Sequence, residues 1–167
     1  MSDATQAPTR RRSPTATELA TWREYVETAT AVSRALEADL AGSSGISSGD
    51  YTVMLALSEA PDRRLRSSDL AEVAGWERSR LSHHLRRMEE RGLVARGPVG
   101  GDARGAAVAL TDDGARLFRS ASATHLRLVR EVFVDAFSAD ELEQMAGLTA
   151  RLRAHLEARR GASESSA

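Results

Sequence analysis

Residues 67–92 read SSDLAEVAGWERSRLSHHLRRMEERG, and this stretch determines the fold of the middle of the chain. A serine suited to capping a helix opens the stretch, and Gly75 interrupts it. The spacing therefore predicts a short helix before Gly75 and a longer helix over about 77–91, which Gly92 ends. The apolar face of the longer helix is expected to carry Leu81, Leu85 and Met88. Two helices joined by a glycine turn are typical of a helix-turn-helix.

The polar face of the longer helix carries the side chains that we expect to contact DNA. In a helix-turn-helix the second helix lies in the major groove, where arginine pairs with guanine and serine bonds either type of base. Arginines farther along such a helix reach phosphates. The predicted contacts are Arg78, Ser79, Arg80, Ser82, His83, Arg86 and Arg87. The alternative interpretation is an amphipathic helix whose charged face is merely solvated.

A turn-rich segment, GGDARG at 100–105, lies between two stretches typical of strands, 93–99 and 106–111. A two-stranded hairpin directly after a helix-turn-helix is a wing. An arginine at its tip, here Arg104, can enter a narrow minor groove, where the negative potential is enhanced. We expect Asp102 to pair with Arg104 or another arginine and so fix the tip. The alternative is an ordinary glycine turn.

Long amphipathic helices are predicted on both sides of this middle region. Apolar side chains recur at helical spacing from Leu19 to Leu40, and again in the segments that follow Thr111 and Ser138. Because these helices are long and far apart in the sequence, we expect them to pack together and against a second copy of the chain. The predicted dimer interface comprises Leu19, Val26, Phe133, Phe137, Leu142, Met145, Leu148 and Leu152.

The expected fold is mainly α with a small β-wing. The chain has 167 residues, of which 41% are hydrophobic and 28% charged, the balance of a globular protein. A winged helix-turn-helix is predicted at 47–111, between helical dimerisation segments at 15–46 and 112–160. The terminal segments 1–14 and 161–167 lack large apolar side chains and are expected to be disordered.

Charge and composition narrow the classes of function. The net charge is −1, yet residues 63–104 hold 10 arginines against 6 acidic residues. This basic centre between acidic flanks suggests an anion-binding module. The absence of cysteine excludes disulfides, thiolate nucleophiles and thiol-based redox sensing. No apolar run approaches the roughly 18 residues of a membrane span, and no secretory signal is apparent, so we expect a cytoplasmic protein without a membrane partner.

Several segments together resemble the MarR family of bacterial transcriptional regulators. They are the recognition helix and Gly-Leu-Val within 76–96, the Asp-x-Arg of the wing at 102–104, and the segment 108–114. The resemblance covers about residues 15–160 and implies a homodimer with interlocking terminal helices. It also implies a regulator, usually a repressor, that binds a pseudo-palindromic operator with two recognition helices about one helical turn apart. His84 stands where many members have an aliphatic residue, which leaves open whether it faces the DNA or the helix packing.

The same resemblance implies release from DNA by a small aromatic or phenolic effector. We expect such a ligand to change the distance between the two recognition helices. Aromatic walls with one cation suit a ligand of this kind. Residues of that character are Trp22, Arg23, Tyr25, Tyr51, Met54 and Trp76. The alternative for each is ordinary core packing, because such residues at helical spacing are usually buried.

Three other classes of function compete with a DNA-binding regulator. In a winged helix that binds only protein, the arginines would be solvated or dock a peptide, and a shallow salt dependence of duplex binding would reveal it. A metal-responsive regulator needs clustered ligands, but His83 and His84 point about 100° apart on a helix, so no metal and no cofactor are expected. An enzyme is not expected, because phosphate-loop, catalytic-cysteine and Gly-x-Ser-x-Gly motifs are absent.

Overall fold

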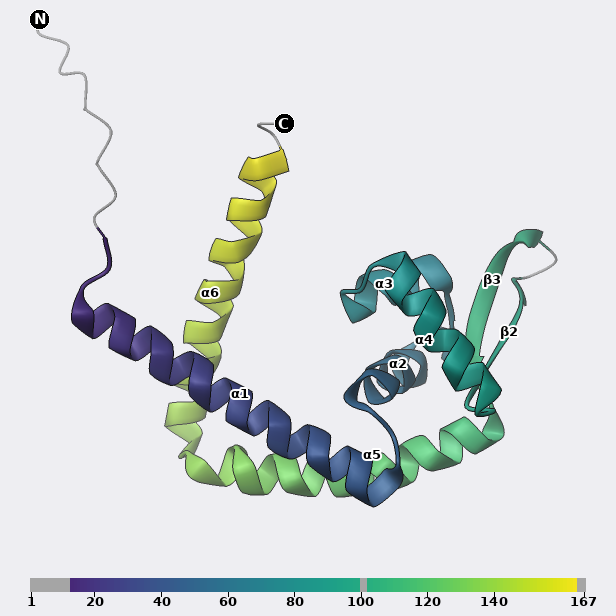
Figure 1. Ribbon diagram of the computed structural model, residues 1–167, viewed down its shortest axis with the longest axis horizontal. Coiled ribbons are helices and arrows are strands. Elements are labelled where there is room, and N and C mark those ends of the chain that lie inside the picture. Colours follow the sequence, from purple (N-terminus) through teal and green to yellow (C-terminus); the bar gives the residue numbers. More distant parts are fainter. Residues whose placement is uncertain (1–12, 100–101, 165–167) are drawn as a thin grey trace, which may run out of the picture. The chain divides into compact units, whose positions relative to one another are not determined.

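A computed structural model describes residues 13–99 and 102–164, with the side chains of 13–97 and 107–163. Most of these residues are helical (Figure 1). In chain order the elements are α1 (Ala16–Ser44), α2 (Ser48–Glu59), β1 (Arg64–Arg66), α3 (Ser67–Ala74), α4 (Arg78–Glu90), β2 (Val94–Val99), β3 (Asp102–Leu110), α5 (Asp112–Val132) and α6 (Ala139–Glu164), with short 3-10 helices η1 (Pro61–Arg63) and η2 (Val134–Ala136). The mainly α fold with a small sheet is thus confirmed.

The chain divides into two compact units, one through Arg34 and one from Ala35 onward. The described part of the first unit is the leading stretch of α1. Thr15 and Glu18 begin this helix with a reciprocal pair, in which the Thr15 N–H donates to the Glu18 carboxylate at 2.6 Å and the Glu18 N–H donates to the Thr15 hydroxyl at 3.2 Å. The first residues of the predicted disordered arm, 1–12, lie outside the described residues.

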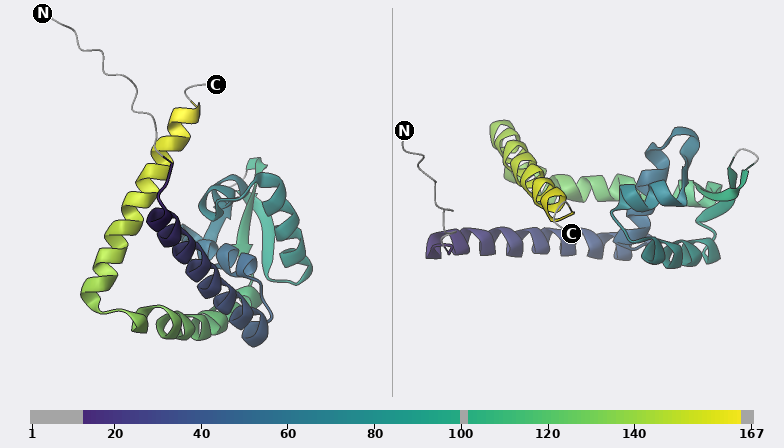
Figure 2. Two further views of the ribbon diagram at one scale, coloured as in Figure 1. Left: turned by 60° about the vertical axis from the view of Figure 1, so that its left-hand side comes forward. Right: turned by 90° about the horizontal axis from the view of Figure 1, so that it is seen from above.

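The second unit contains a three-stranded antiparallel sheet in the order β1-β3-β2. Leu65 and Arg96 both pair with Val108 of the central strand. The β2–β3 hairpin extends beyond the helices as a wing (Figures 1 and 2). β3 begins at Asp102, within the stretch 100–105 that was predicted as a loop. The pairing passes from Pro98↔Ala106 to Val99↔Asp102, so residues 103–105 form an irregularity within β3.

The hydrophobic core lies among α2, α3, α4 and the sheet. The predicted apolar face of α4 is confirmed, since Leu81, Leu85 and Met88 are at most 1% exposed. These side chains pack in one cluster with residues of α2, α3 and β3, among them Val53, Met54, Leu57, Leu70 and Val108. Burial of this face holds α4 on the body of the domain and leaves its polar face outward.

The last two helices each begin at a residue that caps the helix. Thr111 caps α5 by accepting the Gly114 N–H at 3.0 Å. Ser138 and Glu141 form a capping box ahead of α6, with the Ser138 N–H donating to the Glu141 carboxylate at 2.8 Å. The predicted disorder from residue 161 is wrong for 161–164, where α6 continues. A single glycine costs a helix only about 1 kcal/mol, so Gly161 does not end it.

Within the described residues, no helix combines the length and the apolar character that crossing a membrane requires.

Candidate nucleic-acid interface

The turn between α3 and α4 sets the direction of the recognition helix. Gly75 adopts a left-handed conformation with φ 65°, and its N–H bonds to the carbonyls of Ala71 and Glu72. The Trp76 N–H then donates to the Ala71 carbonyl at 2.9 Å, which closes the turn. Glycine tolerates this backbone without the cost of a Cβ. The predicted helix-turn-helix is therefore present.

The outward face of α4 carries the polar residues predicted for DNA contact. All of the residues Arg78, Ser79, Arg80, Ser82, His83, Arg86 and Arg87 are exposed. Some of them are already engaged. Arg86 Nη2 lies 3.2 Å from His83 Nδ1, and the Arg80 guanidinium carbon lies 4.5 Å from the centroid of the Trp76 ring. The face is thus basic and solvent-accessible, and part of it is held in place by neighbouring side chains.

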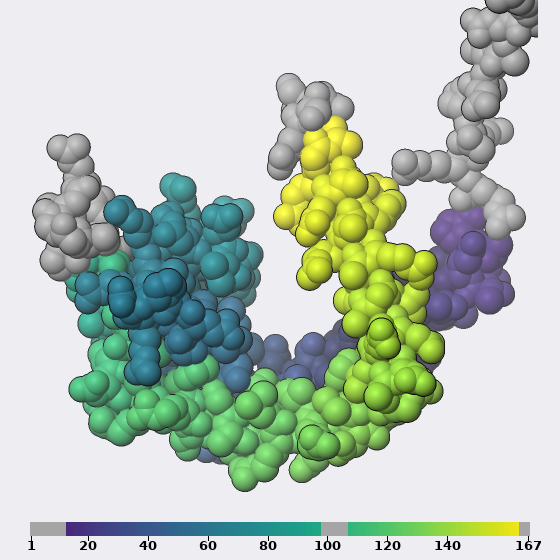
Figure 3. All heavy atoms as spheres, turned by 180° about the vertical axis from the view of Figure 1, so that it is seen from behind, coloured from purple at the N-terminus to yellow at the C-terminus, as the bar shows by residue number. Residues whose placement is uncertain are grey.

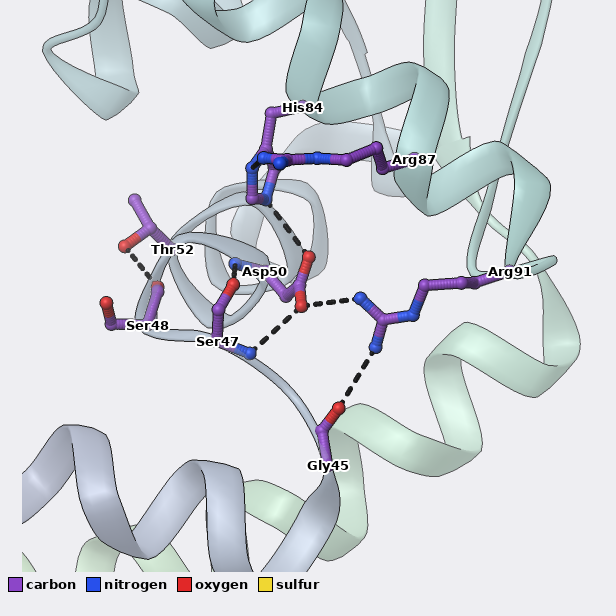
Figure 4. Close-up of polar contacts among 8 residues, drawn as sticks. All are labelled: Gly45, Ser47, Ser48, Asp50, Thr52, His84, Arg87 and Arg91. Atoms are coloured by element: carbon purple, nitrogen blue, oxygen red, sulfur yellow. Dashed lines mark hydrogen bonds and ion pairs between the residues drawn. The ribbon is translucent and has the colours of Figure 1, made fainter.

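His84 faces the helix packing, which answers the question that the sequence left open. Only 9% of the residue is exposed, and its Nε2 atom lies 3.0 Å from Oδ1 of Asp50 in α2 (Figure 4). On its other side, Nδ1 lies 3.1 Å from Nη2 of Arg87. Because arginine can only donate, Nδ1 accepts this hydrogen bond and the neutral ring carries its proton on Nε2. His84 therefore joins the recognition helix to the first turn of α2.

Asp50 is the centre of this link, and it is 3% exposed. Its Oδ2 atom accepts the Ser47 N–H at 2.9 Å and a bond from Arg91 Nη1 at 2.7 Å (Figure 4). Arg91 also donates to the Gly45 carbonyl at 3.2 Å. Asp50 and Arg91 were not among the residues predicted from the sequence. The Ser-x-x-Asp spacing at 47–50 was the one local signal, because it is that of a capping box.

The surroundings of Asp50 and His84 lower the pKa of both side chains. Burial favours the uncharged acid of Asp50, but Arg91 and the Ser47 N–H outweigh it and lower the pKa of Asp50. Burial lowers the pKa of His84, and Arg87 and Arg80 act in the same direction against the attraction of Asp50. At neutral pH the link therefore consists of a neutral imidazole and a charged carboxylate.

We expect acidification to weaken the fold through His84. Its ordinary pKa is 6.5 and its folded pKa is lower, so the unfolded chain binds more protons between the two values. The free energy of unfolding therefore decreases as the pH falls through the region below 6.5. The variant His84→Gln keeps a donor for Asp50 and an acceptor for Arg87 but does not titrate. Urea unfolding at about pH 7.5 and about pH 5.5 should show a smaller loss for His84→Gln than for the wild type.

His83→Gln is the matched control for this prediction, because His83 is the exposed neighbour on the same helix. It should follow the pH dependence of the wild type. Equal pH dependence in the wild type and in His84→Gln would contradict the assigned role of His84.

A pocket of about 450 Å³ opens beside this link. Its wall combines apolar side chains with two arginines and the carboxylate of Asp50. The lining residues are Ala41, Gly45, Ile46, Ser47, Asp50, His84, Arg87 and Arg91. A volume of this size suits a small organic ligand, and the guanidinium groups favour an anion.

The wing is joined to the recognition helix at its base. Arg96 of β2 pairs with Glu89 of α4 at 3.1 Å and donates to the Ser82 carbonyl at 3.3 Å. Arg96 therefore connects the wing to the recognition helix, and it was not among the residues predicted from the sequence. Asp102 and Arg104 lie in β3. The structure does not describe their side chains, so their predicted pairing stays a prediction.

The residues predicted for an effector site do not behave as one group. Trp22, Arg23 and Tyr25 are exposed on the part of α1 that belongs to the first unit. In the second unit, Tyr51 packs against Phe118 and His125 with centroid distances of 5.5 and 4.5 Å. Trp76 meets His84 edge to face at 5.0 Å.

Met54 is fully buried in the hydrophobic core, and its predicted part in an effector site stays a prediction. Its helical spacing reflects packing. The pocket beside His84 includes none of the six predicted residues.

The residues predicted for the dimer interface leave much apolar surface uncovered. Leu148 is 57% exposed, Leu152 43% and Phe133 36%. Leu19 and Val26, in the first unit, are 44% and 39% exposed. In the second unit, Figure 3 shows α6 (yellow-green to yellow) projecting beyond α5. A pocket of about 300 Å³ lies along its start, lined by Phe133, Leu142, Met145, Ala146, Thr149, Ala150 and Arg153.

No cluster of three or more histidine, aspartate or glutamate side chains suited to a metal ion occurs in the part of the chain that the structure describes.

Comparison with known proteins places this geometry in context. A sequence profile of the MarR family matches residues 44–105. The structure of AbsC, a MarR family transcriptional regulator from Streptomyces coelicolor, is 33% identical, with a TM-score of 0.82 over 88% of this chain and 99% of AbsC. Sco3205 from the same organism, a MarR family transcriptional regulator solved in complex with DNA, is 32% identical, with a TM-score of 0.82 over 87% of this chain and 91% of Sco3205.

A more distant structure, a mutant of MarR from E. coli complexed with operator DNA, is 23% identical and has a TM-score of 0.69 over 78% of this chain and 91% of that one. At this sequence identity, the similarity supports only a shared fold. Among curated proteins, no sequence matches this chain significantly.

Proposed function

Because the chain belongs to the MarR family of transcriptional regulators, we propose that it binds a pseudo-palindromic DNA operator as a homodimer and represses transcription there. Members of this family are transcription regulators and not enzymes. The observation that carries the proposal is the exposed basic face of α4, held beside a wing by the contacts of Arg96. Sco3205, which has been solved with DNA, supports the same use of this fold.

The proposed homodimer follows from the uncovered apolar side chains of α6. Leu148, Leu152 and Leu156 recur at steps of four and are each more than 40% exposed. A continuous apolar stripe of this kind is unfavourable in water and marks an interaction surface. A two-fold dimer presents two recognition helices, and a separation of about 34 Å between them would match successive major grooves of an operator.

We expect Arg104 of the wing to add affinity by entering the minor groove. Arg104→Ala should weaken operator binding by about 1–3 kcal/mol and leave the dimer intact. Arg119→Ala on α5 removes the same charge outside the helix-turn-helix and the wing, and it should bind nearly as the wild type does. Fluorescence anisotropy at matched salt measures both variants. Wild-type affinity in Arg104→Ala would remove the wing from the interface.

The proposed effector is a small aromatic or phenolic anion. The pocket beside His84 supports this class, because Arg87 and Arg91 offer positive charge and Ile46 and Ala41 offer an apolar wall. A ligand there would contact α4 and the segment that joins α1 to α2. Binding that favours one placement of α4 would alter the spacing of the two recognition helices and lower the affinity for the operator. The residues predicted from the sequence, Trp22, Arg23, Tyr25, Tyr51, Met54 and Trp76, stay candidates for the same role.

The experiment that tests the function is fluorescence anisotropy with a labelled duplex from the region directly upstream of the protein's own coding sequence. A scrambled duplex serves as the control, and the titration is done at two salt concentrations. Tight, sequence-selective binding with a steep salt dependence is expected, because several phosphate contacts release counterions. Equal and weak binding to both duplexes would count against a specific operator in that region and favour a protein partner. Adding a hydroxybenzoate to the bound complex then tests release by an aromatic anion.

A further inference from the structure

Trp76 lies against two residues of α4 and one residue of α2. The rings of Trp76 and His84 meet edge to face, with centroids 5.0 Å apart and an interplanar angle of 80°. On the α2 side, a Cβ added at Gly49 would lie 3.0 Å from the indole. On the solvent side, the guanidinium carbon of Arg80 lies 4.5 Å from the ring centroid. The indole ring therefore packs against Gly49 of α2 and against His84, and the guanidinium of Arg80 lies over it.

The contact with Trp76 uses only the flat face of the Arg80 guanidinium. Arginine stacks on aromatic rings through this face, while its N–H donors point outward in the plane. Within the described residues, the indole ring is the partner of the Arg80 guanidinium and no hydrogen-bond acceptor meets its N–H groups. Arg80 is therefore held in one place with its donors available.

The other arginines of α4 differ from Arg80. Arg86 lies against His83, and Arg87 donates to His84. Arg78 is exposed and has no hydrogen-bond or ion-pair partner among the described side chains. Arg80 is thus the arginine of the exposed face whose position is fixed by a ring while its hydrogen-bonding capacity is unused.

We propose that Trp76 is a positioning residue, which holds Arg80 in the conformation that binds a DNA phosphate. This inference rests on the proposed DNA-binding function. Arg80 directly precedes the buried Leu81 in the sequence, which places it at the edge between the buried and exposed faces of α4. A side chain at such an edge reaches the DNA backbone more readily than the base edges. Ordering the long arginine side chain before binding removes part of the entropy cost of that contact.

The test is a double-mutant cycle with the labelled upstream duplex, measured by fluorescence anisotropy. We expect Trp76→Leu to weaken binding by about three- to tenfold, since each immobilised long side chain is worth about 0.5–1.5 kcal/mol. Trp76→Phe keeps an aromatic face and should lose at most about half of that effect. In the Arg80→Ala background, Trp76→Leu should cause little further loss, because its effect passes through Arg80.

Salt dependence separates a positioning role from a merely structural one. Arg80→Ala should weaken binding to the upstream and the scrambled duplex alike and make the salt slope shallower by about one. Arg78→Ala is the matched control for charge, and its effect should add to that of Trp76→Leu. Equal losses from Trp76→Leu with and without Arg80 would overturn the proposal. A selective loss on the upstream duplex in Arg80→Ala would also overturn it, because that outcome assigns Arg80 to bases.

A measurement without DNA keeps the proposal testable where Trp76 variants fold poorly. In a Trp22→Phe background, Trp76 is the sole tryptophan of the chain. Arg80→Ala should then change the fluorescence intensity or emission maximum of the free protein, and Arg78→Ala should not. Unchanged emission in Arg80→Ala would show that the contact is not formed and would overturn the proposal. Absence of wild-type binding to any duplex would instead contradict the proposed function, and the positioning role with it.

Discussion

Replacing Leu148 and Leu152 together by aspartate is expected to raise the dissociation constant of the dimer at least about a hundredfold, or about 2.8 kcal/mol. Both side chains lie on the uncovered stripe of α6, with 57% and 43% of their surface exposed in the single chain. In the proposed dimer this stripe is buried against the partner. A carboxylate placed there loses its hydration without gaining a counter-charge. Sedimentation equilibrium measures the change directly.

Ala154→Asp is the matched control for the dimer prediction. It adds the same charge to α6 on the side away from Leu148 and Leu152, by helical spacing. It should leave the dimer intact, and circular dichroism should show that all variants keep their helices. A native-size dimer of the double variant at micromolar concentration would contradict the assignment of this stripe to the interface. Because one recognition helix alone reads half an operator, dissociation should also abolish tight binding to the duplex.

Exchanging Gly114 for alanine is expected to lower the free energy of unfolding by about 3 kcal/mol. Gly114 is buried in the first turn of α5, and a Cβ at this position would overlap the backbone carbonyl of Leu93. Backbone cannot move aside as a flexible side chain can. The same junction is tied by Thr111, whose hydroxyl donates to the Gly92 carbonyl at 2.6 Å and whose N–H donates to the Leu93 carbonyl at 3.2 Å. Urea unfolding of the variant and the wild type checks the value.

Gly147→Ala is the counterpart for this measurement. Gly147 lies within α6, and a Cβ there would meet no atom within 4 Å. Alanine is the better helix former, so this variant should gain about 0.5–1 kcal/mol. Opposite signs for the two glycines would separate the close approach at Leu93 from the general preference of helices for alanine. A Gly114→Ala variant as stable as the wild type would show that α5 can shift away from Leu93 at no cost.

The link of Asp50 with His84 and Arg91 connects the functional face to the rest of the second unit. Asp50, beside the segment that joins α1 to α2, lies 3.0 Å from His84 Nε2 of α4 and 2.7 Å from Arg91 Nη1 at the end of α4. The proposed effector pocket borders the same residues. A ligand anion there would compete with Asp50 for Arg91, which gives a physical route from ligand binding to the placement of the recognition helix.

Local patterns were enough to predict the order of the elements. Apolar residues at helical spacing, the glycine after α3, and the caps at Thr111 and Ser138 act over one or two turns of chain. They require only neighbouring residues to be interpreted. The exposed polar face of α4 follows in the same way, because burial of Leu81 and Leu85 leaves the opposite side to solvent. The predicted end of α6 was too early, because the interior of a helix tolerates one glycine.

The partners of the buried polar residues follow from long-range packing. Asp50 and Arg91 are 41 positions apart, and their contact exists because α2 and the end of α4 meet in space. His84 and Met54 lie on helical stripes like those of many surface or pocket residues, and their burial depends on which neighbouring element covers them. The chain's periodicity shows which side of a helix is apolar, whereas the crossing of helices in three dimensions determines what each side chain touches.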